Sequence, residues 1–327
     1  MKKVAIIGAG LSGLTAAYFL ENYAEVFIFE KSNGLGGRMS TRRHDRYSFD
    51  HGAQYFTVKT KQFSDFIKPL IDNGAVKRWD TKCVNIVNYN VVEEQNWNSQ
   101  QPRFVGVPGM NQLVKHFATG RNIFMNKRVV SIEVDSEGAV RDEDGKTYNG
   151  FDLIILAVPG PQALSLLLPS FNYYDEIKKI EMNPCFSLLL GFDKEFAIDF
   201  GAAKILDSDV SWLAVNSKKP GRSDPFSLVL QSSVNFARKN INEDHKKIMA
   251  HLMEETTRII KRDVSSASVK KIHRWVYASN QKKENKSFFL DRKLKLAVCG
   301  DWCNNGKVEG AFCSAYDLVA ELKNKFF

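Results

Sequence analysis

A glycine-rich segment near the N-terminus, followed by an acidic residue, has the residue types and spacing to bind a dinucleotide. Residues 8–13 read Gly-Ala-Gly-Leu-Ser-Gly, and an acid lies about twenty residues beyond them. Such glycines allow a tight turn, a close approach of the pyrophosphate and close packing of helix on strand. N–H groups at a helix start bind phosphate, and the carboxylate accepts ribose hydroxyls but repels the 2′-phosphate of NADP. The candidate binding residues here are Gly8, Gly10, Leu11, Ser12, Gly13 and Glu30.

The surrounding sequence predicts the elements that must position this segment. Residues 3–7 form a nearly continuous apolar run, which is typical of a strand buried on both faces. Residues 14–20 are rich in alanine and leucine and predict a helix, and residues 25–29 predict a second strand. A strand, glycine turn, helix and strand in this order predict a Rossmann-like α/β fold.

A second glycine pair follows the acidic residue and indicates a longer cofactor than NAD. Residues 31–42 read Lys-Ser-Asn-Gly-Leu-Gly-Gly-Arg-Met-Ser-Thr-Arg. A backbone of this kind can lie flat against a pyrophosphate and a ribityl chain while an arginine offsets the charge. The segment resembles the glycine-rich continuation of FAD enzymes of the glutathione-reductase and amine-oxidase type. We therefore expect FAD, with Lys31, Gly37, Arg38, Met39 and Arg42 among the binding residues.

A third candidate region lies near the C-terminus. Residues 294–298 predict a buried strand, followed by Gly300-Asp301 and by a helix that opens at Val308. The aspartate could accept a ribityl hydroxyl, and the N–H groups of the helix start could face the flavin and stabilise its reduced, anionic ring. Earlier in the chain, residues 151–158 predict another buried strand, and a strand opening at residue 128 could contact the adenine. The candidate binding residues are Val129, Gly300, Asp301, Val308, Glu309, Gly310 and Ala311.

Four blocks resemble signatures of the renalase family, a branch of the amine-oxidase-like flavoproteins. They are residues 49–57, 103–110, 273–278 and 300–303, which occur in the family's order and span almost the whole chain. The resemblance implies non-covalent FAD that also contacts Gly52, Ala53 and Gln54. It implies oxidation of dihydronicotinamide isomers, reduced at ring carbon 2 or 6, to NAD(P)+. The hydride would pass to flavin N5, and O2 would reoxidise the flavin to give H2O2.

One loop departs from the family pattern. The family has an apolar residue, two glycines and an arginine where residues 304–307 here read Asn-Asn-Gly-Lys. Lys307 keeps the charge of an arginine but not its planar fork. Substrate contacts of this loop are therefore not carried over from the family.

Four polar or aromatic residues are the candidates for the catalytic face of the flavin. A hydride acceptor needs stacking and orientation of its substrate more than an acid or a base, and the sequence offers no paired acids or nucleophile with a base. For the tyrosines and the tryptophan, core packing is a competing interpretation, and we interpret His51 as a structural histidine. The candidates are Gln54, Tyr55, Trp275 and Tyr277.

Composition excludes several other classes of protein. The 327 residues are 44% hydrophobic and 25% charged, which is typical of a globular protein, and the formal net charge is +9. Basic pairs such as Lys218-Lys219 are scattered, which predicts a solvated basic surface and no nucleic-acid partner. Five cysteines without a disulfide framework or zinc-site spacing predict reduced thiols, no metal and a cytoplasmic protein. No apolar run is long enough for a membrane span.

The motifs predict a discontinuous α/β architecture of two domains. The FAD-binding domain comprises residues 1–56, 103–160 and 290–327, and the substrate domain comprises residues 57–102 and 161–289. For the second domain we expect a mostly antiparallel sheet, with strands at residues 186–192, 212–215 and 226–231. Helical spacing predicts helices at residues 63–71 and 248–260, and the polar stretch 85–101 is either a hairpin or an exposed loop. Substrate would bind between this sheet and the flavin.

Other functions remain open on the sequence alone. An amine oxidase in the stricter sense would use the same fold with an aromatic cage for a small amine. A non-catalytic redox sensor would place Cys303 beside the flavin. Another FAD oxidoreductase, such as a desaturase, is the remaining alternative.

Overall fold

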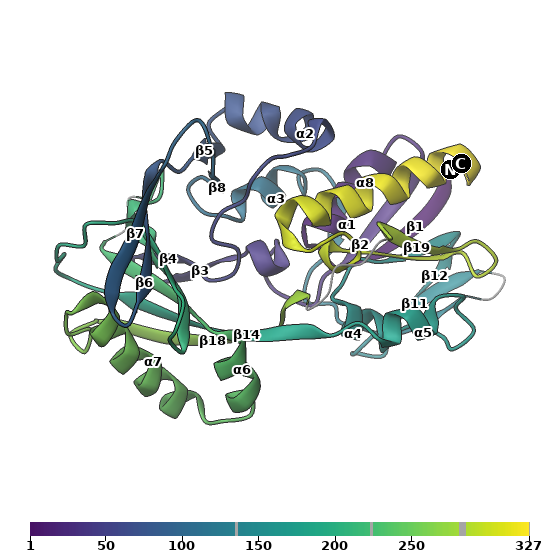
Figure 1. Ribbon diagram of the computed structural model, residues 1–327. Coiled ribbons are helices and arrows are strands. Elements are labelled where there is room, and N and C mark those ends of the chain that lie inside the picture. Colours follow the sequence, from purple (N-terminus) through teal and green to yellow (C-terminus); the bar gives the residue numbers. More distant parts are fainter. Residues whose placement is uncertain (135–136, 223–224, 281–285, 327) are drawn as a thin grey trace.

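The computed structural model describes residues 1–134, 137–222, 225–280 and 286–326. The chain folds into two halves, and the N- and C-termini lie close together in one of them (Figure 1). The other half is built on a large sheet, from which strand β14 (Met182–Gly191) extends toward the first half (Figure 1). Within the described ranges, no helix combines the length and the apolar character needed to cross a membrane.

A six-stranded sheet forms the centre of the half that holds both termini. Its strands pair in parallel except for the edge strand β19, which is antiparallel to β20. Successive residues of the first strand point to opposite faces, so that Val4 and Ile6 enter one core and Ala5 and Ile7 another. Burial on both faces explains the continuous apolar run. In spatial order the strands are β19 (Phe288–Asp291), β20 (Leu296–Cys299), β13 (Leu153–Leu156), β1 (Lys2–Ile7), β2 (Ala24–Phe29) and β9 (Asn122–Phe124).

Each face of this sheet is covered by a different layer. Helices α1 (Leu11–Leu20) and α8 (Lys307–Lys325) bury their apolar residues on one face. The other face packs against a three-stranded antiparallel sheet and two short helices. These are β10 (Val129–Glu133), β11 (Gly138–Asp142), β12 (Thr147–Phe151), α4 (Gly160–Leu164) and α5 (Tyr174–Lys178).

The N-terminal and C-terminal elements lie where the sequence predicted them, with small shifts at their ends. Helix α1 begins at Leu11, earlier than the predicted residue 14, because its first turn includes the glycine segment. The predicted strand 151–158 is wrong in extent. Phe151 ends β12, and only Leu153–Leu156 continue as β13 in the large sheet.

A seven-stranded sheet forms the centre of the other half. Five of its pairings are antiparallel, and β15 pairs in parallel with β6. Helices α6 (Val234–Asn240) and α7 (His245–Ile260) cover one face (Figure 1). In spatial order the strands are β18 (Val269–Asn280), β14 (Met182–Gly191), β17 (Ser227–Ser232), β16 (Val210–Val215), β15 (Ala202–Ile205), β6 (Thr81–Val87) and β7 (Asn90–Trp97).

The polar stretch 85–101 forms a hairpin rather than a loop. Strands β6 and β7 pair antiparallel, and β7 is the exposed edge of the seven-stranded sheet. An edge strand tolerates polar residues on both faces because few of its side chains are buried. Polarity was therefore compatible with a strand at this position.

Helix α2 (Lys61–Asp72) connects the two halves in sequence but packs on the half with both termini. Its Phe63 ring lies 5.1 Å from the ring of Phe312 on α8. Ile71, the last residue of the predicted helix 63–71, is 39% exposed, because Ile67 and Leu70 already occupy the buried face. The remaining elements are β3 (Thr41–His44), β4 (Tyr47–Asp50), β5 (Val76–Arg78), β8 (Phe104–Gly106), α3 (Gln112–His116), η1 (Gly37–Met39), η2 (Asn216–Lys218) and η3 (Asp301–Cys303).

Candidate functional site

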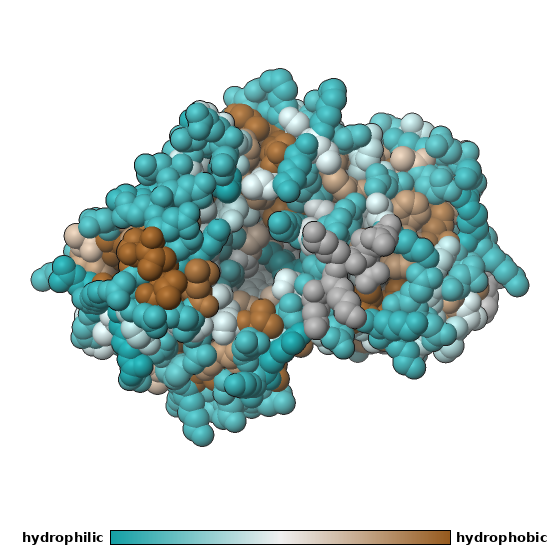
Figure 2. All heavy atoms as spheres, viewed as in Figure 1, coloured by the Kyte–Doolittle hydropathy of each residue, from teal (hydrophilic) through white to brown (hydrophobic). Residues whose placement is uncertain are grey.

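A deep cleft lies between the two halves and holds nearly all of the predicted site residues. Its volume is about 2660 Å³. Figure 2 shows the molecule hollowed at the middle of this view, between the two halves. Of the predicted cofactor-binding and catalytic residues, every one lines the cleft except Gly13. The fold thus brings together residues from both ends and the middle of the chain.

The first glycine segment forms a tight turn at one wall of the cleft. Gly8 has a positive φ of 106° and donates its N–H to the carbonyl of Phe29, at 2.8 Å. Gly13 lies behind the wall, and a Cβ placed on it would sit 2.0 Å from the carbonyl oxygen of Gly8. Only glycine permits this close packing of the helix on the turn.

Glu30 connects the two glycine segments. Its Oε2 accepts the N–H of Ala9 at 2.8 Å, and its Oε1 accepts the N–H of Ser32 at 2.8 Å. Each carboxylate oxygen can accept more than one hydrogen bond, so Glu30 can still accept a hydrogen bond from a ligand. The acid therefore orders the backbone of this wall as well as presenting a negative charge.

Arg38 ties the second glycine segment to the C-terminal loop. Its Nη1 donates to Asp301 Oδ2 at 3.0 Å, and its Nη2 donates to Asp301 Oδ1. The carbonyl of Arg38 accepts the N–H of Ala53 at 2.8 Å, and a Cβ on Gly52 would lie 2.0 Å from that same carbonyl. Two predicted binding residues, Arg38 and Asp301, thus pair with each other on the cleft wall.

The residues at the start of α8 line the cleft. Gly306 precedes the helix and donates its N–H to the carbonyl of Asp301 at 2.7 Å. The carboxylate of Glu309 accepts the N–H groups of Lys59 and Thr60, at 3.0 and 2.7 Å. That side chain therefore holds the segment after residue 57 against the helix.

The catalytic candidates also contribute to packing. The ring of Tyr55 lies 4.9 Å from Trp97 and 5.7 Å from Trp212, and burial raises the pKa of its hydroxyl. Trp275 donates its Nε1 hydrogen to the carbonyl of His51 at 2.9 Å. Both residues line the cleft. Tyr55 and Trp275 therefore both pack against other side chains and line the cleft.

Two histidines form a neutral pair on the wall beside Trp275. The rings of His51 and His273 meet edge to face at 4.7 Å, and His51 stacks on Trp275 at 5.0 Å. Burial, the neighbouring His273 and Arg42 lower the pKa of His51 to about 3. Burial, followed by Arg42, lowers that of His273 to about 4. Among the described residues, nothing hydrogen-bonds to Nδ1 of His51. The sequence led us to interpret His51 as a structural histidine, and this interpretation did not include its position on the cleft wall.

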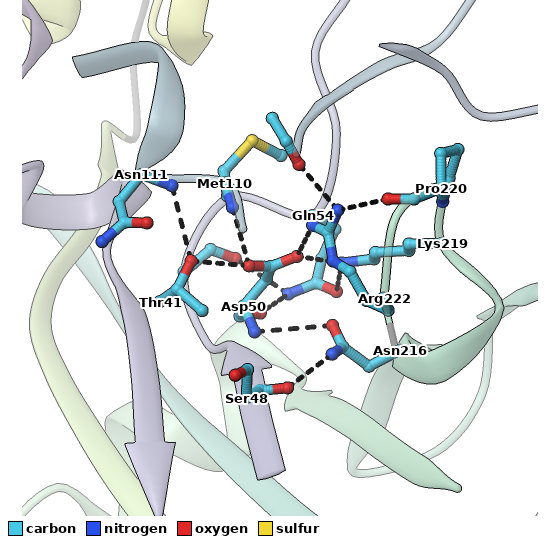
Figure 3. Close-up of polar contacts among 12 residues, drawn as sticks. Thr41, Ser48, Asp50, Gln54, Met110, Asn111, Asn216, Lys219, Pro220 and Arg222 are labelled. Carbon is cyan, nitrogen blue, oxygen red and sulfur yellow. Dashed lines mark hydrogen bonds and ion pairs between the residues drawn. The ribbon is translucent and has the colours of Figure 1, made fainter. Parts of the chain in front are cut away.

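A buried charge cluster lies directly behind the wall (Figure 3). Asp50 ends β4, and its Oδ2 accepts from Lys219 Nζ at 3.2 Å and from Arg222 Nη2. Its Oδ1 accepts from Thr41 Oγ1 at 2.8 Å and from the N–H of Met110 at 2.9 Å. The three charged side chains are at most 1% exposed.

The sequence prediction for Lys219 is therefore wrong. We expected the Lys218-Lys219 pair on a solvated surface, whereas Lys219 is fully buried and only Lys218 is exposed. Burial alone would raise the pKa of Asp50, but the Lys219 and Arg222 charges and the Met110 N–H outweigh it and hold that pKa well below its ordinary value. The cluster keeps its carboxylate charged.

Cationic side chains outnumber acidic ones on the walls of the cleft. Its acids are Glu30, Asp301 and Glu309, and each already accepts hydrogen bonds from the chain. Twelve cationic side chains line the same walls. They are Lys31, Arg38, Arg42, Arg43, Lys59, Arg103, Lys115, Lys127, Arg128, Lys204, Arg274 and Lys307.

The described part of the site holds no cluster of metal ligands, and two cysteines, Cys185 and Cys313, line it. Across the part of the chain that the structure describes, no group of three or more His, Cys, Asp or Glu side chains could hold a metal ion. Cys185 lines the cleft, and burial raises its pKa to about 11. It is a protonated thiol at neutral pH and a poor nucleophile.

Comparison with known proteins agrees with this geometry. Residues 6–70 match the NAD(P)-binding Rossmann-like domain, and residues 90–322 match the flavin containing amine oxidoreductase family. Renalase of Mus musculus is 24% identical over 354 aligned positions, which cover 99% of each chain.

Solved structures share the fold over the whole length. One is an Exiguobacterium sp. 255-15 protein provisionally described as a protoporphyrinogen oxidase, with a TM-score of 0.80, 12% identity and 99% coverage of each chain. Another is the cyclohexylamine oxidase of Brevibacterium oxydans IH-35A, with a TM-score of 0.75, 13% identity and 99% coverage of each chain. The chain belongs to the flavin containing amine oxidoreductase family and is a renalase-like, FAD-dependent oxidoreductase.

Proposed function

We propose that the protein oxidises dihydronicotinamide dinucleotides reduced at ring carbon 2 or 6, to give NAD(P)+. Bound FAD would accept a hydride at N5 and pass the electrons to O2, which yields H2O2. The amine oxidoreductase family and the likeness to renalase support the redox class. The positive charge of the cleft supports a dinucleotide as the substrate.

The residues of the cleft fit a non-covalently held FAD. Gly10 leaves open space where a Cβ would be, which permits a pyrophosphate to approach the backbone beside Leu11 and Ser12. Glu30 retains acceptor capacity for ribose hydroxyls. Arg38 and Asp301 would hold the pyrophosphate and ribityl side of the cofactor. We propose that the other predicted cofactor-binding residues that line the cleft also contact FAD.

The cleft has more positive charge than FAD alone requires. A pyrophosphate carries two negative charges, whereas twelve cations line the walls, of which Arg38, Lys127 and Arg128 form ion pairs with acids of the chain. A second dinucleotide would account for the remaining positive charge. This charge balance is the observation that carries the proposal.

The substrate side combines cations with aromatic rings. The guanidinium of Arg103 lies 5.9 Å from the centroid of the Tyr55 ring, and Lys204 lines the same cleft. A protonated amine near Tyr55 would be repelled by Arg103, whereas a phosphate would be attracted. The histidines His51 and His273 are neutral and offer a polar, uncharged surface. Neutral side chains are compatible with hydride transfer, because that step needs no acid or base from the protein.

The redox-sensor alternative finds less support. Cys303 is fully buried in the hydrophobic core that contains Trp302 and Phe289. It is not among the described residues that line the cleft. A thiol in that position cannot reach a ligand in the cleft without a rearrangement.

Product analysis under air tests the proposal. The holoenzyme is incubated with 2-dihydro-NAD, 6-dihydro-NAD and, separately, putrescine and cyclohexylamine. We expect NAD+ and H2O2 in equal amounts from at least one isomer and no H2O2 from either amine. Peroxide from an amine alone would establish the amine-oxidase alternative.

Reversing the charge of Arg103 tests the substrate side. We expect Arg103→Glu to raise KM for a dihydronicotinamide dinucleotide by about tenfold or more with a smaller change in kcat, because it removes attraction shared by ground and transition states. Steady-state kinetics at low and high salt measure the effect, which salt should reduce. Lys77→Glu, at an exposed position of β5, is the matched control. An unchanged KM would remove Arg103 from the substrate site.

We also propose the domain assignment that the cleft suggests. The FAD-binding domain, of the glutathione-reductase type, comprises residues 1–56, 103–160 and 290–327. The substrate domain comprises residues 57–102 and 161–289. Helices α2, α4 and α5 are exceptions, since α2 packs on α8 and the other two pack on the six-stranded sheet, which favours counting them with the FAD-binding domain.

A further inference from the structure

A buried cation behind the cleft wall plays no part in the binding described above. The Lys219 side chain is 0% exposed, and its Nζ lies 5.3 Å from the centroid of the Trp79 ring. Nζ donates at 3.2 Å to Asp50 Oδ2 and at 3.2 Å to Gln54 Oε1 (Figure 3). Gln54 lines the cleft, whereas Lys219 is absent from the described residues that do so. Gln54 thus separates the ammonium from the ligand.

Asp50 has hydrogen-bond donors besides Lys219. That carboxylate already accepts hydrogen bonds from Arg222, Thr41 and the N–H of Met110. Burying a second cation costs free energy of desolvation, and without Lys219 the Asp50 carboxylate would keep Arg222 as its charged partner. Outside the charged cluster Lys219 contacts the ring of Trp79 and donates to Gln54, and of these two residues only Gln54 lines the cleft.

Lys219 and two backbone carbonyls together determine how the Gln54 amide is turned. An ammonium group only donates, so the amide must present its carbonyl oxygen to Lys219. Its Nε2 then donates to the carbonyls of Asp50 and Gly52, the latter at 3.1 Å. The carbonyl of Gly52 also accepts from Gln231 Nε2 at 2.7 Å. The backbone of the cleft wall at Gly52 is thereby fixed from two sides.

We propose that Lys219 is a positioning residue of the flavin site. Its ammonium fixes the Gln54 amide and, through it, the wall at Gly52 and Ala53. It also places a positive charge one side chain behind the wall, which favours the more negative, reduced state of a cofactor bound there. The inference rests on the placement of FAD in the cleft, which is part of the proposed function, but not on the identity of the substrate.

The protonation of Lys219 gives the effect a pH dependence. Burial lowers the pKa of Lys219 to about 8, although Asp50 opposes the shift, and Arg222 lowers it further. Asp50 and Arg222 are the charged groups in contact with it or beside it in the cluster. The ammonium is therefore mostly charged at pH 7, and its charge is lost as the pH rises through about 8.

The midpoint potential of the bound flavin tests the proposal. Holoenzyme with Lys219→Met or Lys219→Gln is titrated against a reference redox dye at pH 7. Both variants should lower the ratio of reduced to oxidised flavin about tenfold. For a two-electron couple this is a fall of about 30 mV in the midpoint potential. Lys219→Gln keeps a donor without the charge, so only Lys219→Met should also weaken FAD binding. Lys218→Met, at the exposed neighbouring position, is the control and should match the wild type.

The pH profile separates a positioning role from a merely structural one. The wild-type potential should fall toward that of Lys219→Gln above pH 8, where the ammonium is neutral. If folded Lys219→Gln has the wild-type potential and pH profile, the proposal is overturned. If Lys219→Met fails to fold, the comparison of Lys219→Gln with the wild type, in potential and in pH profile, still tests the proposal. The dye titration uses no dihydronicotinamide, so failure of the proposed substrate would leave its result unaffected.

Discussion

Asp50→Asn is expected to destabilise the folded protein by about 3–5 kcal/mol, because it leaves buried cations without a partner charge. Lys219 and Arg222 are 0% and 1% exposed, so water cannot replace the lost carboxylate. An amide that accepts through Oδ1 also cannot serve Lys219, Arg222, Thr41 and Met110 in the same way. Denaturant unfolding followed by fluorescence measures the loss. Asp65→Asn, which breaks an exposed pair with Lys61, should change the free energy of unfolding by less than about 1 kcal/mol.

The same cluster predicts a pH dependence of stability. The pKa of Asp50 is held below its ordinary value, so the carboxylate binds fewer protons in the folded than in the unfolded chain. Its contribution is therefore fully present above about pH 4, the ordinary value for an aspartate, and is lost as the pH falls further. Asp50→Asn should lack this part of the acid sensitivity. Equal losses for Asp50→Asn and Asp65→Asn at neutral pH would show that the cluster is not the determinant we describe.

Gly13→Ala is expected to remove most of the bound FAD, with a loss of affinity of at least about 100-fold. The added Cβ would lie 2.0 Å from the carbonyl oxygen of Gly8, so either α1 or the glycine turn must move. Displacing the turn separates the N–H groups of the helix start from the phosphates they would bind. The flavin absorbance of the purified protein, and the dissociation constant on adding FAD back, measure the effect.

Gly34→Ala is the matched control for Gly13→Ala. Gly34 lines the cleft as part of the second glycine segment, but it is exposed, and no atom of the described chain lies within 4 Å of a Cβ placed on it. We expect this variant to retain FAD nearly as the wild type does. A Gly13→Ala protein with full flavin content would mean that the turn does not hold the pyrophosphate.

Local patterns predicted the nucleotide-binding half well. Gly8, Gly13 and Glu30 lie within one short stretch, where a strand, a tight turn and a helix follow directly from apolar runs and glycines. The resemblance of residues 300–303 to the renalase family also placed the C-terminal loop in the predicted site. A cleft lined by both ends of the chain could therefore be expected before any geometry was known.

The buried cluster could not be predicted in this way. Asp50 and Lys219 are 169 residues apart, and their contact depends on the packing of β4 beside the loop after β16. A lysine beside another lysine predicts exposure, because charged side chains are rarely buried without a partner. The partner, however, is visible only in three dimensions. The same holds for His51, whose neighbours His273 and Trp275 lie on the distant strand β18.

Anaerobic reduction of the flavin tests the central claim most directly. The holoenzyme is mixed with 2- or 6-dihydro-NAD in the absence of O2, and separately with small amines, and the oxidised flavin absorbance is followed in time. We predict rapid bleaching by at least one isomer, formation of one NAD+ per flavin and return of the colour on admission of air. Flavin that stays oxidised with both isomers but bleaches with an amine would contradict the proposed substrate, and only the FAD-dependent oxidoreductase would remain.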